Sequence, residues 1–172
     1  PVAVAPNAST GTRTNTIAAG ALVTDQGSNA FAAAANLAVN QAASVAKSWN
    51  PTTVLSGGIS RLTITISHAN GAIAFTNMGL TDLLTSMGTG FVVAATPNVF
   101  NNCGGTVTAA AGTTSIVLAG GSLGTGATSC QIRVDVQTPP AGAPGNYRNR
   151  IVANNLSTAE GFTFNGNADA NL

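Results

Sequence analysis

The chain has 172 residues, of which only 6% are charged, and its formal net charge is +1. An ordinary globular domain has roughly 25% charged residues, so this chain carries no strong field that would attract nucleic acid or anionic lipid. No apolar run approaches the ~20 residues of a membrane-spanning helix, and no charged segment precedes an apolar one as in a signal peptide. We therefore expect neither a nucleic-acid partner nor a membrane span.

The first part of the chain repeats a later part. Residues 2–27 align with residues 136–161 without a gap, and 9 of these 26 positions are identical, where typical composition gives ~2 by chance. After a shift of one residue, residues 35–37 match residues 170–172. We predict that residues 1–40 are the incomplete C-terminal part of a preceding repeat and that residues 43–172 form one complete repeat. The identical pairs are Val2/Val136, Pro6/Pro140, Gly11/Gly145, Asn15/Asn149, Ile17/Ile151, Ala19/Ala153, Leu22/Leu156, Thr24/Thr158 and Gly27/Gly161.

The segment from residue 29 to residue 47 is open to two interpretations. Its many Ala residues and five apolar positions at helical spacing are compatible with an amphipathic helix. The second copy of this segment, residues 162–172, contains Gly166, Asp169 and several Asn, which is a poor helix sequence. Because the same place in a repeat should have the same structure, we favour extended chain and keep the helix as the alternative. The five apolar positions are Phe31, Ala34, Ala38, Ala42 and Val45.

The complete repeat contains short strands separated by turn signals. The clearest strand covers residues 61–68, where Leu62, Ile64 and Ile66 alternate with polar residues, the pattern of a strand that buries one face. Asn70-Gly71 follows it as a strong tight-turn signal. This organisation is typical of an all-β antiparallel sandwich. Further strands are expected at 44–49, 72–84, 91–95, 106–108, 115–118, 131–136 and 147–153, and in a final segment from 161.

Cys103 and Cys130 are the two cysteines of the sequence. The near absence of Lys and Glu suggests a secreted protein, in which a disulfide forms readily, while two buried thiols remain the alternative. We predict that the two cysteines are bonded to each other and tie the start of the 103–118 hairpin to the 131–136 strand. Such a loop would stabilise the fold by roughly 3–4 kcal/mol, which matters for a core with only 5% aromatic residues in the chain.

No arrangement of residues points to catalysis. His68 is the only histidine, and it lies at the end of a strand beside a turn, where a solvated position is the simpler interpretation. The acidic residues lie far apart in the sequence, and a calcium site built from Asp82 with Asn77 and Thr81 is an interpretation that we do not favour. One His and two Cys are too few for a zinc site. We therefore expect no enzyme activity, no cofactor and no bound metal.

Several motifs together resemble a known family. They look like the Ig-like tandem repeats of unknown function in large bacterial surface and secreted proteins, over about residues 43–172 in full and residues 1–39 as the end of a copy. The resemblance implies an Ig-like antiparallel β-sandwich repeat, a pairing of Cys103 with Cys130, and a place in stalks or surface fibres. The sequence departs from the family at Trp49, where Phe is more usual, and after Asp82, where a turn with Pro is expected. The motifs are Lys47-Ser48-Trp49-Asn50-Pro51, Gly57-Gly58, Leu80-Thr81-Asp82, Cys103-Gly104-Gly105-Thr106-Val107, Cys130, and Gly145-Asn146-Tyr147-Arg148-Asn149.

Two functions remain in competition at this point. The first is a structural unit of an extracellular or cell-surface fibre, stalk or filament, whose partners are copies of itself or neighbouring repeats. The strands of residues 1–39 lack the rest of their unit, so we expect sequence outside these 172 residues to complete them, in a longer chain or in another subunit. The alternative is an adhesive or glycan-binding module that would bind a glycan or surface ligand through exposed aromatic residues. The candidates for that role are Trp49, Tyr147, Phe162 and Phe164.

Overall fold

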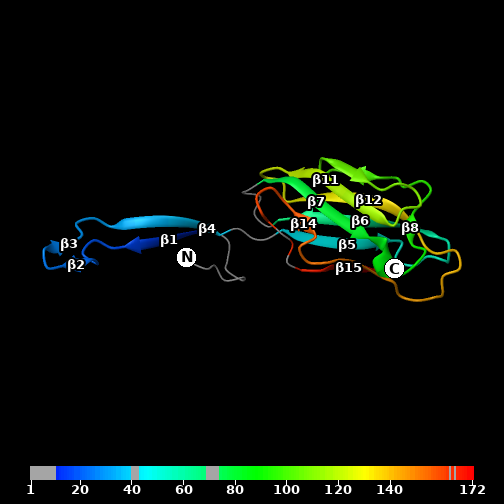
Figure 1. Ribbon diagram of the computed structural model, residues 1–172, viewed down its shortest axis with the longest axis horizontal. Coiled ribbons are helices and arrows are strands. Elements are labelled where there is room, and N and C mark those ends of the chain that lie inside the picture. Colours follow the sequence, from blue (N-terminus) through cyan, green and yellow to red (C-terminus); the bar gives the residue numbers. More distant parts are fainter. Residues whose placement is uncertain (1–10, 40–42, 69–73, 163, 165) are drawn as a thin grey trace. The chain divides into compact units, whose positions relative to one another are not determined.

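The computed structural model of the chain describes residues 11–39, 43–68, 74–162, 164 and 166–172, and it is all-β, as predicted (Figure 1). The chain divides into two compact units, Pro1–Gln41 and Ala42–Leu172. The described residues include a short 3-10 helix, η1 (Leu84–Met87), and no helix among them is long and apolar enough to cross a membrane.

The N-terminal unit is a long β-hairpin. β1 (Gly11–Ile17) and β4 (Ala33–Val39) pair antiparallel along their whole length. At the tip, β2 (Val23–Thr24) pairs with β3 (Gly27–Ser28). Almost every side chain described in this unit is exposed, so the hairpin has no apolar core of its own.

The hairpin decides between helix and strand for residues 29–47. Residues 33–39 are extended because each of them pairs with a residue of β1, and residues 44–50 form the next strand, β5. The helix alternative is therefore wrong for these residues, and the comparison between the two repeat copies gave the correct structure. Residues 40–42 lie outside the described part of the chain.

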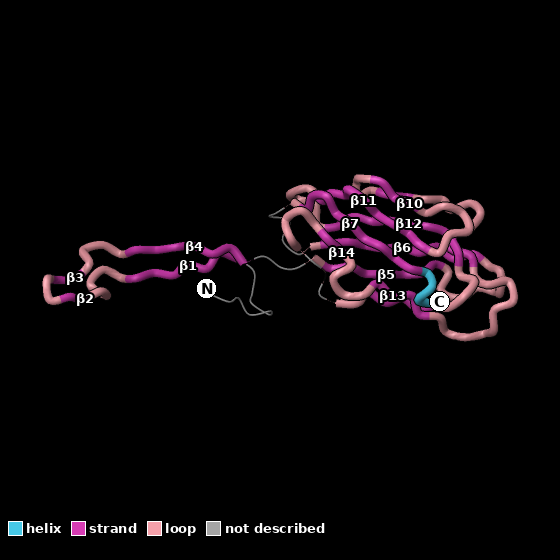
Figure 2. The backbone as a smooth tube through the Cα atoms, in the orientation of Figure 1, coloured by secondary structure: helices cyan, strands magenta, loops and turns pink. Residues whose placement is uncertain are grey.

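The second unit contains two main antiparallel sheets packed face to face (Figure 2). One has the strand order β5-β6-β12-β8, with β9 also pairing with β12, and the other has the order β10-β11-β7-β14. A separate pair, β13-β15, lies against β5. The bounds are β5 (Ser44–Asn50), β6 (Ile59–Ser67), β7 (Phe75–Leu83), β8 (Val92–Val93), β9 (Phe100–Asn101), β10 (Thr106–Thr108), β11 (Ser115–Leu123), β12 (Ser129–Gln137), β13 (Arg148–Ile151), β14 (Leu156–Ser157) and β15 (Ala168–Asn171).

The alternation in β6 and β12 produces the core. Ile64 on β6 lies opposite Ile132 on β12, and both side chains are buried. Their neighbours two residues away along each strand are buried as well, because successive side chains of a strand point to opposite faces. The large residues that fill the space between the sheets include Leu62, Ile66, Phe75, Met78, Leu80, Leu84, Phe91, Ile116, Leu118, Val134 and Val136.

The predicted disulfide is present. Cys103 and Cys130 are bonded to each other, with their Cα atoms 5.0 Å apart and a sequence separation of 27. Cys103 lies just before β10 and Cys130 lies in β12, so the bond joins the hairpin of one sheet to a central strand of the other. Between them, Gly105 has a φ of +63°, and a Cβ atom there would lie 2.3 Å from the carbonyl oxygen of Ala119. That turn therefore requires glycine.

Two expectations about the end of β6 have different outcomes. His68 was expected to be solvated, but its side chain is buried and its ring lies 4.6 Å from the ring of Phe75, so this expectation is wrong. His68 directly follows β6, which ends at Ser67, and its backbone N–H donates to the Thr128 carbonyl at 3.1 Å. The predicted turn at Asn70-Gly71 lies outside the described residues.

Candidate functional site

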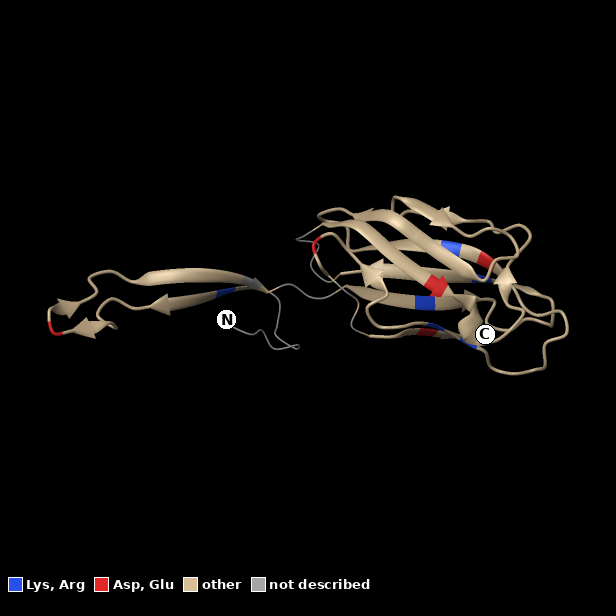
Figure 3. Cartoon of the chain, in the orientation of Figure 1, with Lys and Arg blue, Asp and Glu red and all other residues tan. Residues whose placement is uncertain are grey.

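The candidate site is a buried cluster of three polar side chains, Lys47, Asp82 and Asn149. Each stands at an inward-facing position of a different strand. On β5, Lys47 lies between the buried Val45 and Trp49 in the alternation, and Asp82 follows the buried Leu80 in β7. Asn149 occupies the buried position of β13 two residues before Ile151. Charged residues are few in the rest of the unit (Figure 3), and among the ion pairs of the described residues Lys47–Asp82 alone has both side chains without solvent exposure.

The three side chains contact one another directly. Lys47 Nζ donates to Asp82 Oδ2 at 2.7 Å and also makes a very short contact with Asn149 Oδ1. Asn149 Nδ2 donates to Asp82 Oδ2 at 3.3 Å, which closes a triangle. The lysine and aspartate side chains have no solvent exposure at all. Asp82 Oδ1 is buried and has no hydrogen-bond partner among the described residues.

Burial changes the protonation equilibrium of this pair. It lowers the pKa of Lys47 and raises the pKa of Asp82, and the attraction between the two groups opposes both shifts. Both shifts favour a neutral amine beside a neutral carboxylic acid over a buried ion pair. A carboxylate with one oxygen unsatisfied in an apolar interior is costly, so this cluster is poor as a purely stabilising salt bridge.

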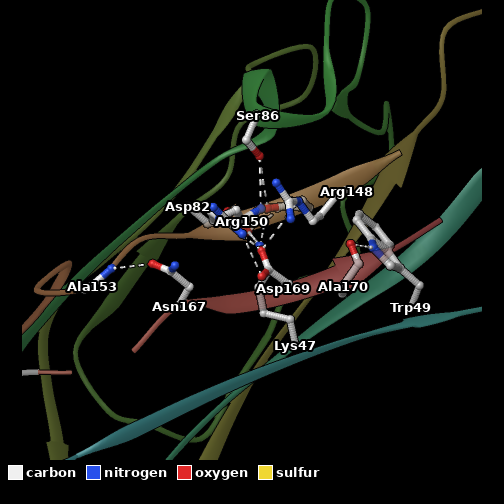
Figure 4. A network of polar contacts seen from close by, with 11 residues as sticks. Lys47, Trp49, Asp82, Ser86, Arg148, Arg150, Ala153, Asn167, Asp169 and Ala170 are labelled. Carbon is white, nitrogen blue, oxygen red and sulfur yellow. Dashed lines mark hydrogen bonds and ion pairs between the residues drawn. The ribbon is translucent and has the colours of Figure 1, made fainter. Parts of the chain in front are cut away.

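A second layer of contacts holds Asn149 in place. Figure 4 shows three residues of this layer, Ser86, Arg150 and Asp169. Ser86, on η1, donates through its Oγ to Asn149 Oδ1 at 3.4 Å and accepts a hydrogen bond from the Arg150 backbone N–H at 3.1 Å. On the outer side of the same strand pair, Arg150 binds Asp169 of β15 through two hydrogen bonds of 2.8 and 3.1 Å. The amide of Asn149 therefore lies between β5, β7 and η1, on a strand that β15 supports.

The aromatic residues proposed for ligand binding do not form an exposed cluster. Trp49 and Phe164 are buried, so the prediction is wrong for both. Trp49 shares the inward face of β5 with Val45, and its Nε1 donates to the Ala170 carbonyl at 3.4 Å. Tyr147 and Phe162 are partly buried and pack against the core. They lie beside different residues: the Tyr147 ring is 4.9 Å from Phe91, and the Phe162 ring is 5.3 Å from Phe75.

A hollow of about 380 Å³ lies beside Tyr147 and is lined mainly by apolar groups. Three of its hydroxyl groups, those of Ser56, Thr138 and Tyr147, have partners within the protein. Ser56 donates to the Pro139 carbonyl at 2.7 Å, and Thr138 donates to the Leu55 carbonyl at 3.1 Å. The Tyr147 hydroxyl donates to the Ala143 carbonyl at 2.6 Å. The hollow therefore offers mainly shape and apolar surface.

The cluster was missed in the sequence because its members are far apart. Asp82 was weighed as a calcium ligand in a loop, whereas it lies in β7 and faces the amine of Lys47. In the described part of the chain, no three His, Cys, Asp or Glu side chains come together as metal ligands would. Two signals were available: Lys47 interrupts the inward face of a predicted strand, and Asn149 is identical to Asn15 in the repeat alignment.

Comparisons with known proteins give one family and several distant structural likenesses, of which two are described. The crystal structure of BslA, a bacterial hydrophobin, is similar with a TM-score of 0.47 and 14% identity, over 78% of this chain and 94% of that one. A family 123 glycoside hydrolase from Clostridium perfringens, studied for glycolipid glycan hydrolysis, is similar with a TM-score of 0.33 and 12% identity, over 75% of this chain and 27% of that one. No curated protein matches the chain.

The family match agrees with the limits of the second unit. The family described as "Domain of unknown function (DUF7933)" matches residues 43–172, and the compact unit begins at Ala42. Since this match covers most of the chain, the protein belongs to the DUF7933 family.

Proposed function

We propose that the chain is a structural unit of an extracellular or cell-surface fibre, stalk or filament, assembled head to tail through β-strand pairing. The observation that carries the proposal is a repeated strand pair. β13 and β15 pair with Arg148 opposite Asn171 and Ile151 opposite Ala168. In β1 and β4, Thr14 lies opposite Asn36 and Ile17 opposite Ala33.

The two pairs have the same register. The sequence alignment equates residues 14–17 with residues 148–151 and, after the shift of one residue, residues 33–36 with residues 168–171. All four strand partnerships of β13-β15 then recur in β1-β4. The N-terminal hairpin thus has the strand pairing of the last strands of a unit, which supports residues 1–40 as the end of a preceding repeat.

The equivalent side chains differ in burial. Ile151 and Leu156 are completely buried, because β13 and β14 lie against the rest of their unit, with Leu156 opposite Leu80 of β7. Their equivalents Ile17 and Leu22 are 52% and 61% exposed. A hairpin with an apolar face and no core is at best marginally stable alone and is a template for another chain. The partner that fits this hairpin is a group of strands equivalent to residues 43–135, which we call the body of a unit. In the complete unit, β13 and β14 pack against such a body.

An extracellular location is part of the proposal. The Cys103–Cys130 disulfide persists most readily outside the cytosol. A surface with few charges and an assembly that need not close are compatible with a fibre rather than with a freely diffusing enzyme. We propose no activity of this unit on other molecules.

Joining a body to the hairpin tests this proposal. The alignment places Val2 at the position of Val136, so residues 43–135 are fused directly before Val2 of the full chain. We expect the amides of residues 11–39 to exchange slowly with solvent in the fused chain and rapidly in the original chain. A fused chain carrying Ile17→Asp is the matched control and should lose the protection. Equal, slow exchange in the original chain would contradict the proposal, because the hairpin would then already be packed.

The adhesive or glycan-binding alternative has one supporting feature, the hollow beside Tyr147. Of the four candidate aromatic residues, only Tyr147 lines it. A glycan array with the wild-type chain and a Tyr147→Ala variant tests this alternative. Binding that the variant loses would favour an adhesive module, and no binding at millimolar concentration would remove it.

A further inference from the structure

The geometry of the buried cluster is that of a nucleophile, an acceptor and a proton carrier. Lys47 is the single lysine of the sequence, and its amine is in direct contact with the carboxamide of Asn149. The carboxyl group of Asp82 touches both: its Oδ2 is 2.7 Å from Lys47 Nζ and 3.3 Å from Asn149 Nδ2. The lysine and aspartate side chains are sealed from bulk solvent.

We propose that Lys47 and Asn149 form an intramolecular isopeptide bond, with Asp82 as the catalytic acid and base. The neutral amine of Lys47 attacks Cγ of Asn149, and a bond forms between Nζ and Cγ. Asp82 takes a proton from Nζ and supplies one to Nδ2. The Cγ–Nδ2 bond then breaks and ammonia leaves. The products are a secondary amide between the two side chains and one molecule of ammonia, and Asp82 returns to its starting state.

The surroundings favour each part of this step. An amine attacks only when it is unprotonated, and burial lowers the pKa of Lys47 while it raises that of Asp82, so both shifts favour transfer of the proton from the amine to the acid. Ser86 Oγ lies 3.4 Å from Asn149 Oδ1, where negative charge develops during the attack, and donates a hydrogen bond there. The strands hold Lys47 Nζ in contact with the carboxamide of Asn149 before any reaction, which favours the attack by proximity.

The reaction also removes one ionisable group from the interior. The buried amine of Lys47 becomes part of a neutral amide, so the site no longer holds two groups that can form a buried ion pair. The new bond joins β5, near the start of the unit, to β13, near its end, across 102 residues of sequence. It therefore cross-links the last strands to the body of their own unit, whether or not units assemble into a fibre.

Intact mass spectrometry of the full chain, denatured and with its disulfide reduced, tests the proposal directly. We expect a mass lower than the sequence mass by about 17 Da, one ammonia. The full sequence mass would overturn the proposal. A loss of about 18 Da, one water, would place the bond between Lys47 and Asp82 and overturn the assignment of Asn149.

Tryptic mapping locates the bond within the wild-type protein. Trypsin cuts after Arg148 and Arg150 and cannot cut after a modified Lys47, so the linked product is residues 14–61 carrying the dipeptide of residues 149–150. Finding this branched peptide supports the proposal, and finding cleavage after Lys47 in all molecules overturns it.

Single substitutions test the roles of Asp82 and of the reacting asparagine separately. Asp82→Asn keeps the shape of the side chain but cannot carry the proton, and we expect it to retain the full mass. A folded Asp82→Asn protein that still loses ammonia would refute the role of Asp82. The matched control is Asn15→Ala, which changes the equivalent asparagine of the exposed hairpin and should keep the loss of about 17 Da. Disappearance of the loss in this control would show that Asn15, rather than Asn149, reacts.

Discussion

A matched pair of substitutions tests whether the two repeat copies differ as their burial indicates. Ile151 and Ile17 occupy the same position in the two strand pairs, but Ile151 is completely buried and Ile17 is 52% exposed. Replacing each by Ala in the full chain makes the same chemical change in two environments. We expect Ile151→Ala to be strongly destabilising and Ile17→Ala to be nearly neutral.

The size of the effect follows from the buried carbon atoms. Ile→Ala removes three carbons, worth about 0.8 kcal/mol each when buried, so the transfer term is about 2.4 kcal/mol. The cavity left in a packed core adds to this, which gives about 2–5 kcal/mol for Ile151→Ala. Ile17→Ala should change the free energy of unfolding by no more than about 0.5 kcal/mol, as at other surface sites.

Urea unfolding followed by Trp fluorescence measures both values. The chain has one Trp, Trp49, which is buried in the second unit and reports on the unfolding of that unit. Leu156→Ala and Leu22→Ala form a second matched pair, with the first buried and the second exposed. A loss above about 1.5 kcal/mol for Ile17→Ala would refute the reasoning, because it would mean that the hairpin is packed within this chain.

Three further predictions concern the disulfide, an ion pair and the fused chain. Cys103→Ser with Cys130→Ser should lower the free energy of unfolding by roughly 3–4 kcal/mol, measured in urea, and an unchanged midpoint would mean that the bond adds nothing. Hydrogen bonds from Arg61 lower the pKa of Asp135, so this pair stabilises the fold above the ordinary Asp value of 3.8 and that stability is lost as the pH falls below it. Asp135→Asn should therefore flatten the pH dependence of the melting temperature below that value, and an identical acid profile would contradict it. The chain with residues 43–135 fused before Val2 contains two lysines and should lose two molecules of ammonia, about 34 Da. Asn15→Ala in that fused chain should reduce the loss to one ammonia. A single loss in the unsubstituted fused chain would exclude Asn15 as a second reacting residue.

The strands could be predicted because their signal is local. Alternating Leu62, Ile64 and Ile66 marks the buried face of β6 without any knowledge of its partners. The hairpin of β10 and β11 follows from its glycines, and the extended state of residues 33–39 follows from the comparison between the two repeat copies. Each of these inferences depends on a few neighbouring residues or on the repeat itself.

The site could not be predicted, because it depends on which strands become neighbours. Lys47, Asp82 and Asn149 belong to three strands separated by dozens of residues, and no local pattern brings them together. Trp49 illustrates the opposite case: its inward direction follows from alternation with Val45, so its burial was within reach of the sequence. His68 was misjudged because its burial comes from the Phe75 ring beside it, on another strand.

The crystal structure of the fused chain tests the central claim most directly. If the hairpin is the end of a preceding repeat, β4 will lie beside the β5 copy in the added body, and Asn15 will contact the added copies of Lys47 and Asp82. Ile17 and Leu22 will then be buried as Ile151 and Leu156 are. A structure in which the added body leaves β1 and β4 exposed, with Asn15 in solvent, would contradict the claim.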